Sequence, residues 1–276
     1  MLDEELVVVG GFSSAGAALA SAESYAPGAA SWRSLPDIPV AVHHPAAAVV
    51  NGQLIVIGGY PGGGLLEATD AVQIFDPVTG AWRLGTPMPA ARGGLAAVAV
   101  DDRVIVAGGA NNGHSVTDVR SYDPATDTWA ELPPMATARD HLALAVLAGR
   151  VHALGGRNQQ SFTLAVHEVY DPAANSWSTA TPLPTGRSGH AAAVSGACLY
   201  ALGGEGNDAR RDGLFPHVER YSAATDKWTE LEPMPNPRHG MSAVAVDGRI
   251  VVVGGGAVAG MGAVGLVDEF VPGECQ

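Results

Sequence analysis

Four arginines occupy one position of a recurring sequence pattern and are the first candidates for chemistry. Each stands ten residues after a tryptophan. The positions are Arg92, Arg139, Arg187 and Arg238, and one further copy of the pattern has Val42 there. Because a guanidinium can hold a carboxylate through two parallel hydrogen bonds, these arginines are predicted to bind an acidic ligand. A structural interpretation stays open, since an arginine that recurs in every copy can also satisfy loop carbonyls and pack its stem.

Histidines gather beside the same position. They are His43, His44, His141, His190 and His239. Imidazoles are common ligands of transition metals, but these stand one, two or three residues after the arginine position, so their side chains need not converge. We therefore expect no metal and no cofactor. We assign His44, His141 and His190 to a ligand-binding face, with packing against loops as the alternative role.

One charged loop has no counterpart elsewhere in the chain. It reads GEGNDARRDGLFPH and contains Asp208, Arg210 and Arg211. Binding residues concentrate in polar loops that a rigid scaffold positions. Asp208 and Arg211 are therefore predicted to contact a ligand. Asn112, in another loop of this kind, joins them. The alternative is a solvated loop tip.

The elements that must hold these residues follow from a repeat. A double glycine begins at Gly10, Gly58, Gly108, Gly155, Gly203 and Gly254. In the complete copies an aromatic residue precedes the tryptophan by seven, and the arginine position precedes the next double glycine by sixteen. Only the interval from the double glycine to the aromatic residue varies, between 13 and 17 residues. Fixed spacing indicates strands whose register is set by a buried face, and variable spacing indicates a surface loop. Each copy is thus predicted to form four strands, with the loops after the second and fourth strands on the same face.

This pattern resembles the Kelch repeat, which is marked by a double glycine, a spaced tyrosine and tryptophan, and a period near fifty. The resemblance implies an all-β, six-bladed Kelch-type β-propeller of four-stranded antiparallel blades. We expect one domain over residues 1–276, with blades at about 1–37, 38–87, 88–134, 135–182, 183–233 and 234–276. The first copy lacks its innermost strand and the last lacks its tryptophan strand, so 22 strands are expected where six complete blades would have 24.

Composition excludes several classes of partner. A net charge of −13 argues against nucleic acid, because phosphate contacts need a concentrated basic surface. No stretch approaches the ~20 apolar residues of a membrane span, so no membrane association is expected. The chain is predicted to be cytoplasmic, unless the true N-terminus lies upstream of Met1. Cys198 and Cys275 lie in different settings and are expected to be unpaired thiols.

Two functions from different classes remain. The first is a binding module that recognises a peptide, protein or glycan through acidic groups at the channel-mouth face. The second, an enzyme, rests on the resemblance to bacterial sialic acid mutarotases, which are also six-bladed Kelch proteins. Mutarotation needs an acid, a base and a cation for the sugar carboxylate, which Glu205, Asp208, His190 and Arg211 could supply. The sequence leaves the ligand and the oligomeric state open.

Overall fold

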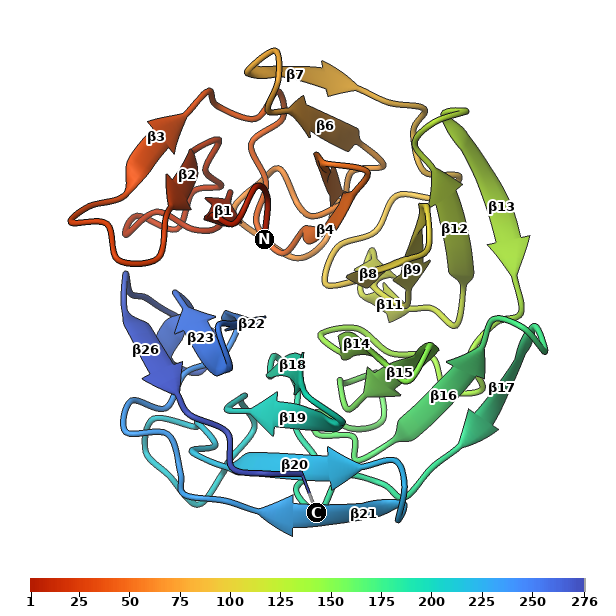
Figure 1. Ribbon diagram of the computed structural model, residues 1–276, viewed down its shortest axis with the longest axis vertical. Coiled ribbons are helices and arrows are strands. Elements are labelled where there is room, and N and C mark those ends of the chain that lie inside the picture. The colour runs from red at the N-terminus through yellow and green to blue at the C-terminus, as the bar shows by residue number, and fades with distance from the viewer. Residues whose placement is uncertain (276) are drawn as a thin grey trace. The chain divides into compact units, whose positions relative to one another are not determined.

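The computed structural model describes residues 1–275, and their regular secondary structure is entirely β (Figure 1). The chain divides into two compact units, Met1–Leu132 and Pro133–Gln276. Each unit contains three antiparallel sheets of three or four strands and one two-stranded hairpin, and each of the larger sheets is built from one copy of the repeat. We call these sheets blades 1 to 6 in chain order.

The first unit holds blades 1 to 3. Blade 1 has three strands and blades 2 and 3 have four, each meandering from one neighbour to the next. The strands are β1 (Leu6–Val9), β2 (Ala22–Tyr25) and β3 (Arg33–Leu35); β4 (Ala46–Val50), β5 (Gln53–Ile57), β6 (Val72–Asp76) and β7 (Ala81–Leu84); and β8 (Ala96–Val100), β9 (Arg103–Ala107), β12 (Val119–Asp123) and β13 (Thr128–Leu132). A small hairpin, β10 (Ala110–Asn111) and β11 (His114–Ser115), lies in the variable loop of blade 3.

The second unit holds blades 4 to 6. Blades 4 and 5 have four strands and blade 6 has three. The strands are β14 (Ala143–Leu147), β15 (Arg150–Leu154), β16 (His167–Asp171) and β17 (Ser176–Thr179); β18 (Ala191–Ser195), β19 (Cys198–Leu202), β20 (Val218–Ser222) and β21 (Lys227–Glu230); and β22 (Ser242–Val246), β23 (Arg249–Val253) and β26 (Val267–Phe270). The variable loop of blade 6 forms the hairpin β24 (Gly256–Val258) and β25 (Met261–Ala263).

The blades therefore contain the 22 strands that the repeat predicted, and the two missing strands are the predicted ones. Within each unit, apolar side chains of neighbouring blades form the core. Blades 2 and 3 share one cluster, blades 4 and 5 a second, and blades 5 and 6 a third. This packing is the reason that a four-stranded unit, which cannot bury both of its faces alone, is stable in the repeat.

The recurring aromatic residues pair across the two outer strands of each complete blade. Tyr122 lies opposite Trp129, with ring centroids 4.9 Å apart, and the same register joins Tyr221 to Trp228 at 5.1 Å. The indole N–H of Trp228 donates to the Thr181 carbonyl of the preceding blade at 2.9 Å. Trp228 thus stabilises its own sheet and also ties it to its neighbour.

The double glycine has the role that the repeat suggested. At Gly58 the backbone has φ +64°, and a Cβ there would lie 2.4 Å from the carbonyl oxygen of Arg92. Gly59, at φ +99°, donates its N–H to that same carbonyl at 3.0 Å. Only glycine permits both the left-handed conformation and this approach of one blade's backbone to the next.

The expectation of unpaired cysteines is wrong, because Cys198 and Cys275 form a disulfide with a Cα–Cα distance of 5.7 Å. Alignment of the repeat copies shows which position Cys275 occupies. Cys275 stands five residues after Phe270, and the residues at that distance from Tyr122 and Tyr221 are Asp127 and Asp226. Asp226 accepts from the Thr181 N–H of the preceding blade at 2.9 Å. In blade 6 a covalent bond to blade 5 replaces that hydrogen bond.

Candidate functional site

Two loops of each blade meet where the double glycine ends the second strand. The residue after the arginine position forms an isolated bridge with the residue after the double glycine. The bridged pairs are His43 and Tyr60, Gly93 and Ala110, Asp140 and Arg157, Ser188 and Glu205, and His239 and Gly256. These bridges confirm that the loops after the second and fourth strands lie on one face of their blade. We call the face made this way by blades 4 to 6 the loop face of the second unit.

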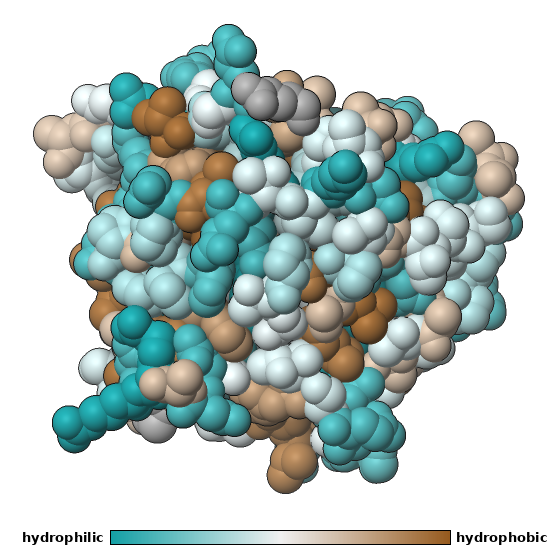
Figure 2. Space-filling view, turned by 90° about the horizontal axis from the view of Figure 1, so that it is seen from below, coloured by the Kyte–Doolittle hydropathy of each residue, from teal (hydrophilic) through white to brown (hydrophobic). Residues whose placement is uncertain are grey.

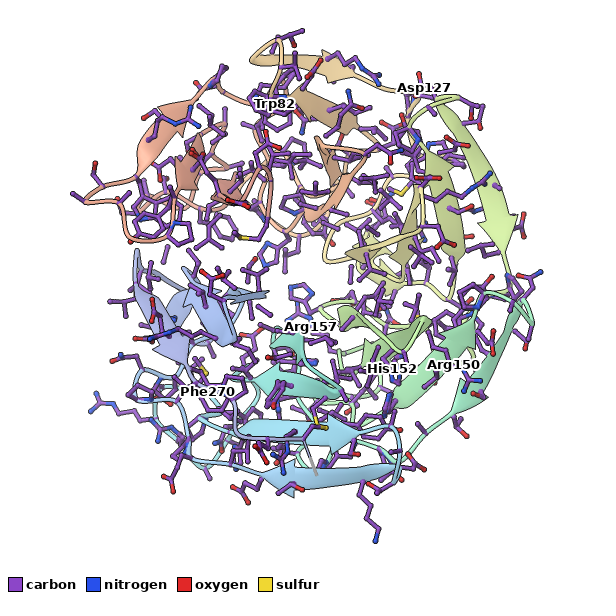
Figure 3. The ribbon with its side chains drawn as sticks, in the orientation of Figure 1. Trp82, Asp127, Arg150, His152, Arg157 and Phe270 are labelled. Atoms are coloured by element: carbon purple, nitrogen blue, oxygen red, sulfur yellow. A yellow bond between two sulfur atoms is a disulfide. The ribbon has the colours of Figure 1, made fainter. Side chains whose placement is uncertain are left out.

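Charged residues of blade 4 begin a buried network on this face. The Arg157 Nε lies 3.0 Å from Asp140 Oδ1, and His141 Nδ1 lies 2.6 Å from the same oxygen. Arg157 Nη2 is 3.2 Å from His141 Nε2. Asp140 and His141 are buried, whereas 17% of the Arg157 side chain is exposed and its guanidinium stacks over Phe162, 4.9 Å from the ring centroid. Figure 3 shows Arg157 near the inner strands β14 and β18.

Blades 5 and 6 complete this network. Glu205 is 2% exposed, and its Oε1 lies 3.4 Å from Arg157 Nη1. Its Oε2 accepts from the Gly260 N–H at 2.9 Å and lies 3.7 Å from His239 Nε2. Burial lowers the pKa of His239, the Glu205 carboxylate opposing this shift, so the imidazole is neutral at neutral pH. We name Asp140, His141, Arg157, Glu205 and His239 the charged cluster; it holds two carboxylates, one guanidinium and two imidazoles.

His141 is held in an unusual backbone conformation. Its φ is +53°, and Gly189 and Gly240 stand at the equivalent positions of blades 5 and 6 with φ +59° and +61°. His44 is the corresponding residue of blade 2, with φ +52°. A non-glycine side chain in this region costs energy, and such residues concentrate at functional sites. Both histidines were predicted site residues.

The first unit has an aromatic cluster at the equivalent positions. The His43 ring stacks on Phe12 at 3.9 Å between centroids and lies 5.4 Å from Tyr60. His43 Nδ1 is 2.6 Å from His44 Nδ1, and the Tyr60 hydroxyl donates to the Ala110 carbonyl at 3.0 Å. The corresponding positions of blade 3 are glycine and alanine. Chemistry on this face therefore differs from blade to blade while the backbone repeats.

The four predicted arginines lie inside the blades. Arg139, Arg187 and Arg238 have no exposed surface, and Arg92 is 2% exposed. Arg187 Nη1 lies 2.6 Å from a Glu219 oxygen, and its Nη2 donates to the Ala201 carbonyl at 3.1 Å. Arg139 has the same arrangement with Glu168 at 2.8 Å, and burial lowers the pKa of Arg139 to about 10, so it stays charged at neutral pH. This geometry favours the structural interpretation, and ligand binding by these arginines stays a prediction.

The partner of each buried arginine changes together with it. Where Val42 replaces the arginine, Gln73 stands at the position of Glu168 and Glu219, two residues before the aromatic residue. Where Arg120 occupies that position, Arg92 pairs instead with Asp118 at 2.8 Å, and Arg120 binds the same carboxylate at 2.9 Å. Each buried arginine is thus paired with a carboxylate of its own blade, as burial of an ion requires.

The remaining predicted residues lie apart from one another. His190 is buried at a position that is leucine in blades 3 and 4, neither ring nitrogen has a hydrogen-bond partner within residues 1–275, and burial lowers its pKa well below the usual range. Asn112, at φ +51°, forms the turn of the β10–β11 hairpin together with Gly113, as Asn-Gly commonly does. Asp208 and Arg211 are exposed, while the adjacent Arg210 pairs with Asp212 at 2.6 Å.

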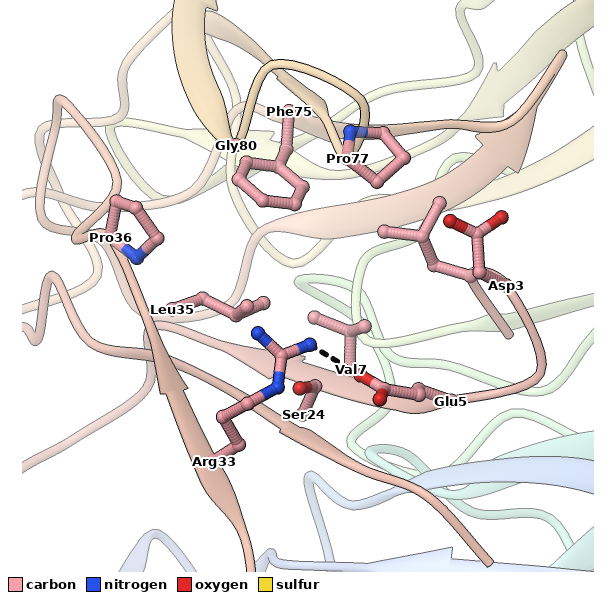
Figure 4. Close-up of a pocket in the computed structure, with 11 residues that line it drawn as sticks. Asp3, Glu5, Val7, Ser24, Arg33, Leu35, Pro36, Phe75, Pro77 and Gly80 are labelled. Atoms are coloured by element: carbon pink, nitrogen blue, oxygen red, sulfur yellow. Dashed lines mark hydrogen bonds and ion pairs between the residues drawn. The ribbon is translucent and has the colours of Figure 1, made fainter.

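No three His, Cys, Asp or Glu side chains in the described part of the chain are placed to hold a metal ion. A hollow of about 290 Å³ lies in the first unit, and Figure 4 shows its lining. Phe75, Pro36 and Leu35 form an apolar wall. Three charged residues also line the hollow, Asp3, Glu5 and Arg33, and the last two pair at 2.8 Å. Because the one cation of this lining is already paired with a carboxylate, the hollow offers less for the recognition of an acidic ligand than the charged cluster.

Comparison with known proteins identifies the family. The Attractin/LZTR1 β-propeller model matches residues 62–260. The chain belongs to this β-propeller family. Its fold is that of a six-bladed Kelch-type β-propeller in which the first and last blades each have three strands.

Individual relatives share shorter segments with this propeller. Kelch-like protein terF of Aspergillus terreus is 40% identical over 68 residues, which are 25% of this chain and 15% of that protein. Kelch-like protein 35 of Mus musculus is 41% identical over 88 residues, which are 32% of this chain and 15% of that protein. The matched segments thus span about a sixth of each relative, which supports the repeat and says nothing of the activity of the whole proteins.

A solved structure shares the fold of this propeller over nearly all its length. The structure of YjhT superposes with a TM-score of 0.82, covering 97% of this chain and 91% of that one, at 17% sequence identity. At that identity the likeness concerns the fold alone, and function must be argued from the site.

The sequence analysis names Glu205 only as a candidate for the acid or base of the enzymatic function and does not single out Arg157. The missed signal is one repeat position, directly after the double glycine. It is held by Phe12, Tyr60, Ala110, Arg157, Glu205 and Gly256. The backbone register places this residue at the same point of every blade. Because its type differs from blade to blade, it identifies a part of the surface whose chemistry varies on a constant scaffold.

Proposed function

We propose that this propeller is a binding module that recognises a peptide, protein or glycan with an acidic group through the loop face of the second unit. The observation that carries the proposal is the charged cluster. Ionised side chains are seldom buried without a strong structural reason, and a strained His141 beside them suggests a functional one. That the two units together form a single domain is part of this proposal.

Two cations on this face could hold the acidic group. Arg157 keeps part of its side chain exposed and packs against Phe162, a residue that is 50% exposed and adds apolar contact area. Arg211 is exposed in the neighbouring blade 5 loop and has no ion pair with the described residues. A carboxylate that approaches between these loops would meet Arg211 first and the more rigid Arg157 second.

A thermal-shift titration tests the proposal. The protein is titrated with acidic sugars, including sialic acid, and with Asp/Glu-rich peptides, since a ligand that binds only the folded state raises the Tm. We expect at least one of these classes to raise the Tm, and we expect Arg211→Ala to remove most of the shift.

Arg249→Ala is the control, because Arg249 is also an exposed arginine but stands at the end of β23 opposite the double glycine, where it pairs with Glu269 at 2.6 Å. It should leave the ligand-induced shift unchanged. If both variants reduce the shift equally, or if no member of the panel raises the Tm of the wild type, the proposal is contradicted.

A second candidate is a small carbohydrate-active enzyme that interconverts anomers, as the resemblance to sialic acid mutarotases suggested. It is favoured by Glu205 and His239, whose side chains lie 3.7 Å apart. The carboxylate could act as the base beside a bound sugar, and the imidazole, once protonated, as the acid. The Arg157 guanidinium, 3.4 Å from Glu205, would hold the sugar carboxylate.

The enzymatic candidate is tested by following the anomeric proton signals of freshly dissolved sialic acid by NMR. An enzyme would speed their equilibration, and Glu205→Gln, which keeps the shape of the side chain, would abolish the acceleration. Equal rates with and without protein exclude this activity and leave the binding module.

The compartment in which the protein resides determines which acidic ligands it can encounter. No helix among residues 1–275 is long and apolar enough to cross a membrane. The predicted cytoplasmic location stays a proposal, and the disulfide favours an oxidising compartment instead.

A further inference from the structure

The outer edge of blade 6 differs from that of every other blade. In blades 2 to 5 the third strand, β6, β12, β16 or β20, pairs with a fourth strand outside it. In blade 6 the third strand, β26, pairs only with β23 among the described residues. Figure 1 shows β26 as the last arrow of its blade, whereas β17 and β21 lie outside β16 and β20.

The residues of this edge are correspondingly exposed. The first four residues of β16 are buried, whereas β26 alternates between exposed and half-buried residues. Leu266, Val267 and Val271 expose 42%, 42% and 67% of their surface. On the side of the molecule in Figure 2, apolar side chains form small patches among hydrophilic ones. An unpaired strand edge flanked by apolar side chains is a template for pairing with another chain.

The complete blades define the partner that fits. In each of them a tryptophan on the fourth strand lies directly opposite the aromatic residue of the third, as Trp177 does opposite Tyr170 with centroids 5.3 Å apart. In β26 the aromatic position is held by Phe270, which is half-buried and has no tryptophan opposite it among the described residues. Its ring lies 6.0 Å from that of Tyr200 in blade 5.

A hydrogen-bond acceptor for such a tryptophan is also defined by the repeat. The indole N–H donates to a carbonyl of the preceding blade, four residues after that blade's own tryptophan: Trp129 to Thr86 at 3.0 Å, and Trp228 to Thr181 at 2.9 Å. For blade 6 the same count leads to the carbonyl of Glu232 in blade 5.

We propose that the outer edge of β26 binds an extended segment of a partner protein, with a tryptophan opposite Phe270 and its indole N–H directed to the Glu232 carbonyl. The segment would add a fourth strand to blade 6, so its flanking residues face solvent, as the exposed neighbours of Trp177 do in β17. The chain's net charge of −13 favours a partner segment that is neutral or basic. This surface is distinct from the loop face and does not depend on the function proposed above.

The fourth strand of blade 2 supplies a probe. A labelled peptide with the sequence of residues 79–86, TGAWRLGT, is titrated with the intact protein and followed by fluorescence anisotropy. We expect saturable binding that weakens at least about tenfold when alanine replaces the tryptophan, and likewise when alternate backbone amides are methylated. Equal binding of the parent and alanine peptides overturns the proposal.

The position of the bound peptide is measured without a variant, by hydrogen exchange. Peptide should slow exchange of the amides of Val267–Phe270, and protection confined to other strands overturns the proposal. Phe270→Ala should weaken binding at least about fivefold, whereas Phe162→Ala, at an exposed aromatic on the loop face, should not. Arg211→Ala should also leave peptide binding unchanged, which separates this result from the test of the loop face.

Discussion

In blades 4, 5 and 6 the buried arginine acts as the counterion of an acid on the third strand. Arg187 has no exposed surface and Glu219 only 1%, and the pair is 2.6 Å apart. In blade 2 the same two positions are Val42 and Gln73, whose amide hydrogen-bonds the backbone of Val40 at 2.7 and 3.2 Å. The repeat thus contains two solutions to one packing problem, one ionic and one neutral.

Arg187→Val and Glu219→Gln test whether these solutions are interchangeable. Arg187→Val alone leaves a buried carboxylate without its counterion, and we expect a loss of about 3–5 kcal/mol in the free energy of unfolding. The double variant copies blade 2, so its loss should be smaller than that of Arg187→Val alone. Urea denaturation measures both. A double variant that is less stable than Arg187→Val would show that the pair is not a self-contained unit.

At the scale of elements, the repeat predicts strands well because period and register are set by local burial. The count of strands, the two incomplete blades and the positions of Tyr122 and Trp129 follow from constant spacings. The charged cluster does not follow, because Glu205 and Arg157 come from different blades and their distance depends on how two loops fold over the strand ends. The disulfide was missed because Cys275 was not aligned with the turn residues Asp127 and Asp226.

A histidine pair at the interface of blades 4 and 5 gives the fold a dependence on pH. His152 Nδ1 and His167 Nε2 are 2.8 Å apart, and His167 Nδ1 lies 2.9 Å from the Thr181 carbonyl, so both rings are neutral donors in one chain of hydrogen bonds. Burial lowers the pKa of His152 to about 4 from its usual 6.5. Figure 3 shows His152 on the inner side of the blade.

Protonation of His152 therefore occurs more readily in the unfolded chain. The contribution of this pair is complete above pH 6.5 and is lost as the pH falls toward 4, because the unfolded state then binds more protons. From His152 alone we expect a loss of roughly 2 kcal/mol in the free energy of unfolding between pH 6.5 and 5. His152→Ile, which copies Ile55 and Ile105 at the same position of blades 2 and 3, should flatten the profile. An unchanged slope in this variant would assign the dependence to other buried histidines such as His190.

At the scale of the whole molecule, the disulfide is the single covalent link between distant parts of the described chain. It joins Cys198, which is fully buried in β19, to the segment after β26, across 77 residues. Hydrogen bonds reinforce this link, since the Glu274 carbonyl accepts from Arg220 at 2.5 Å and the Gly273 carbonyl from Tyr200 at 3.4 Å. The bond thus holds blade 6 to blade 5 on the side where blade 6 lacks a fourth strand.

Closing a loop of this length restricts the unfolded chain, and we expect Cys275→Ser to lower the free energy of unfolding by about 4 kcal/mol. The remaining Cys198 thiol is tolerated in an apolar core, so the loss reports the link itself. Urea denaturation of the wild type with and without reductant should reproduce this difference, whereas Cys275→Ser should be indifferent to reductant. Two titratable thiols in the unfolded wild type before reduction would contradict the pairing. Because glutathione keeps cytosolic thiols reduced, a wild type purified with the bond intact would in turn favour an oxidising compartment and thus extracellular or periplasmic ligands for the loop face.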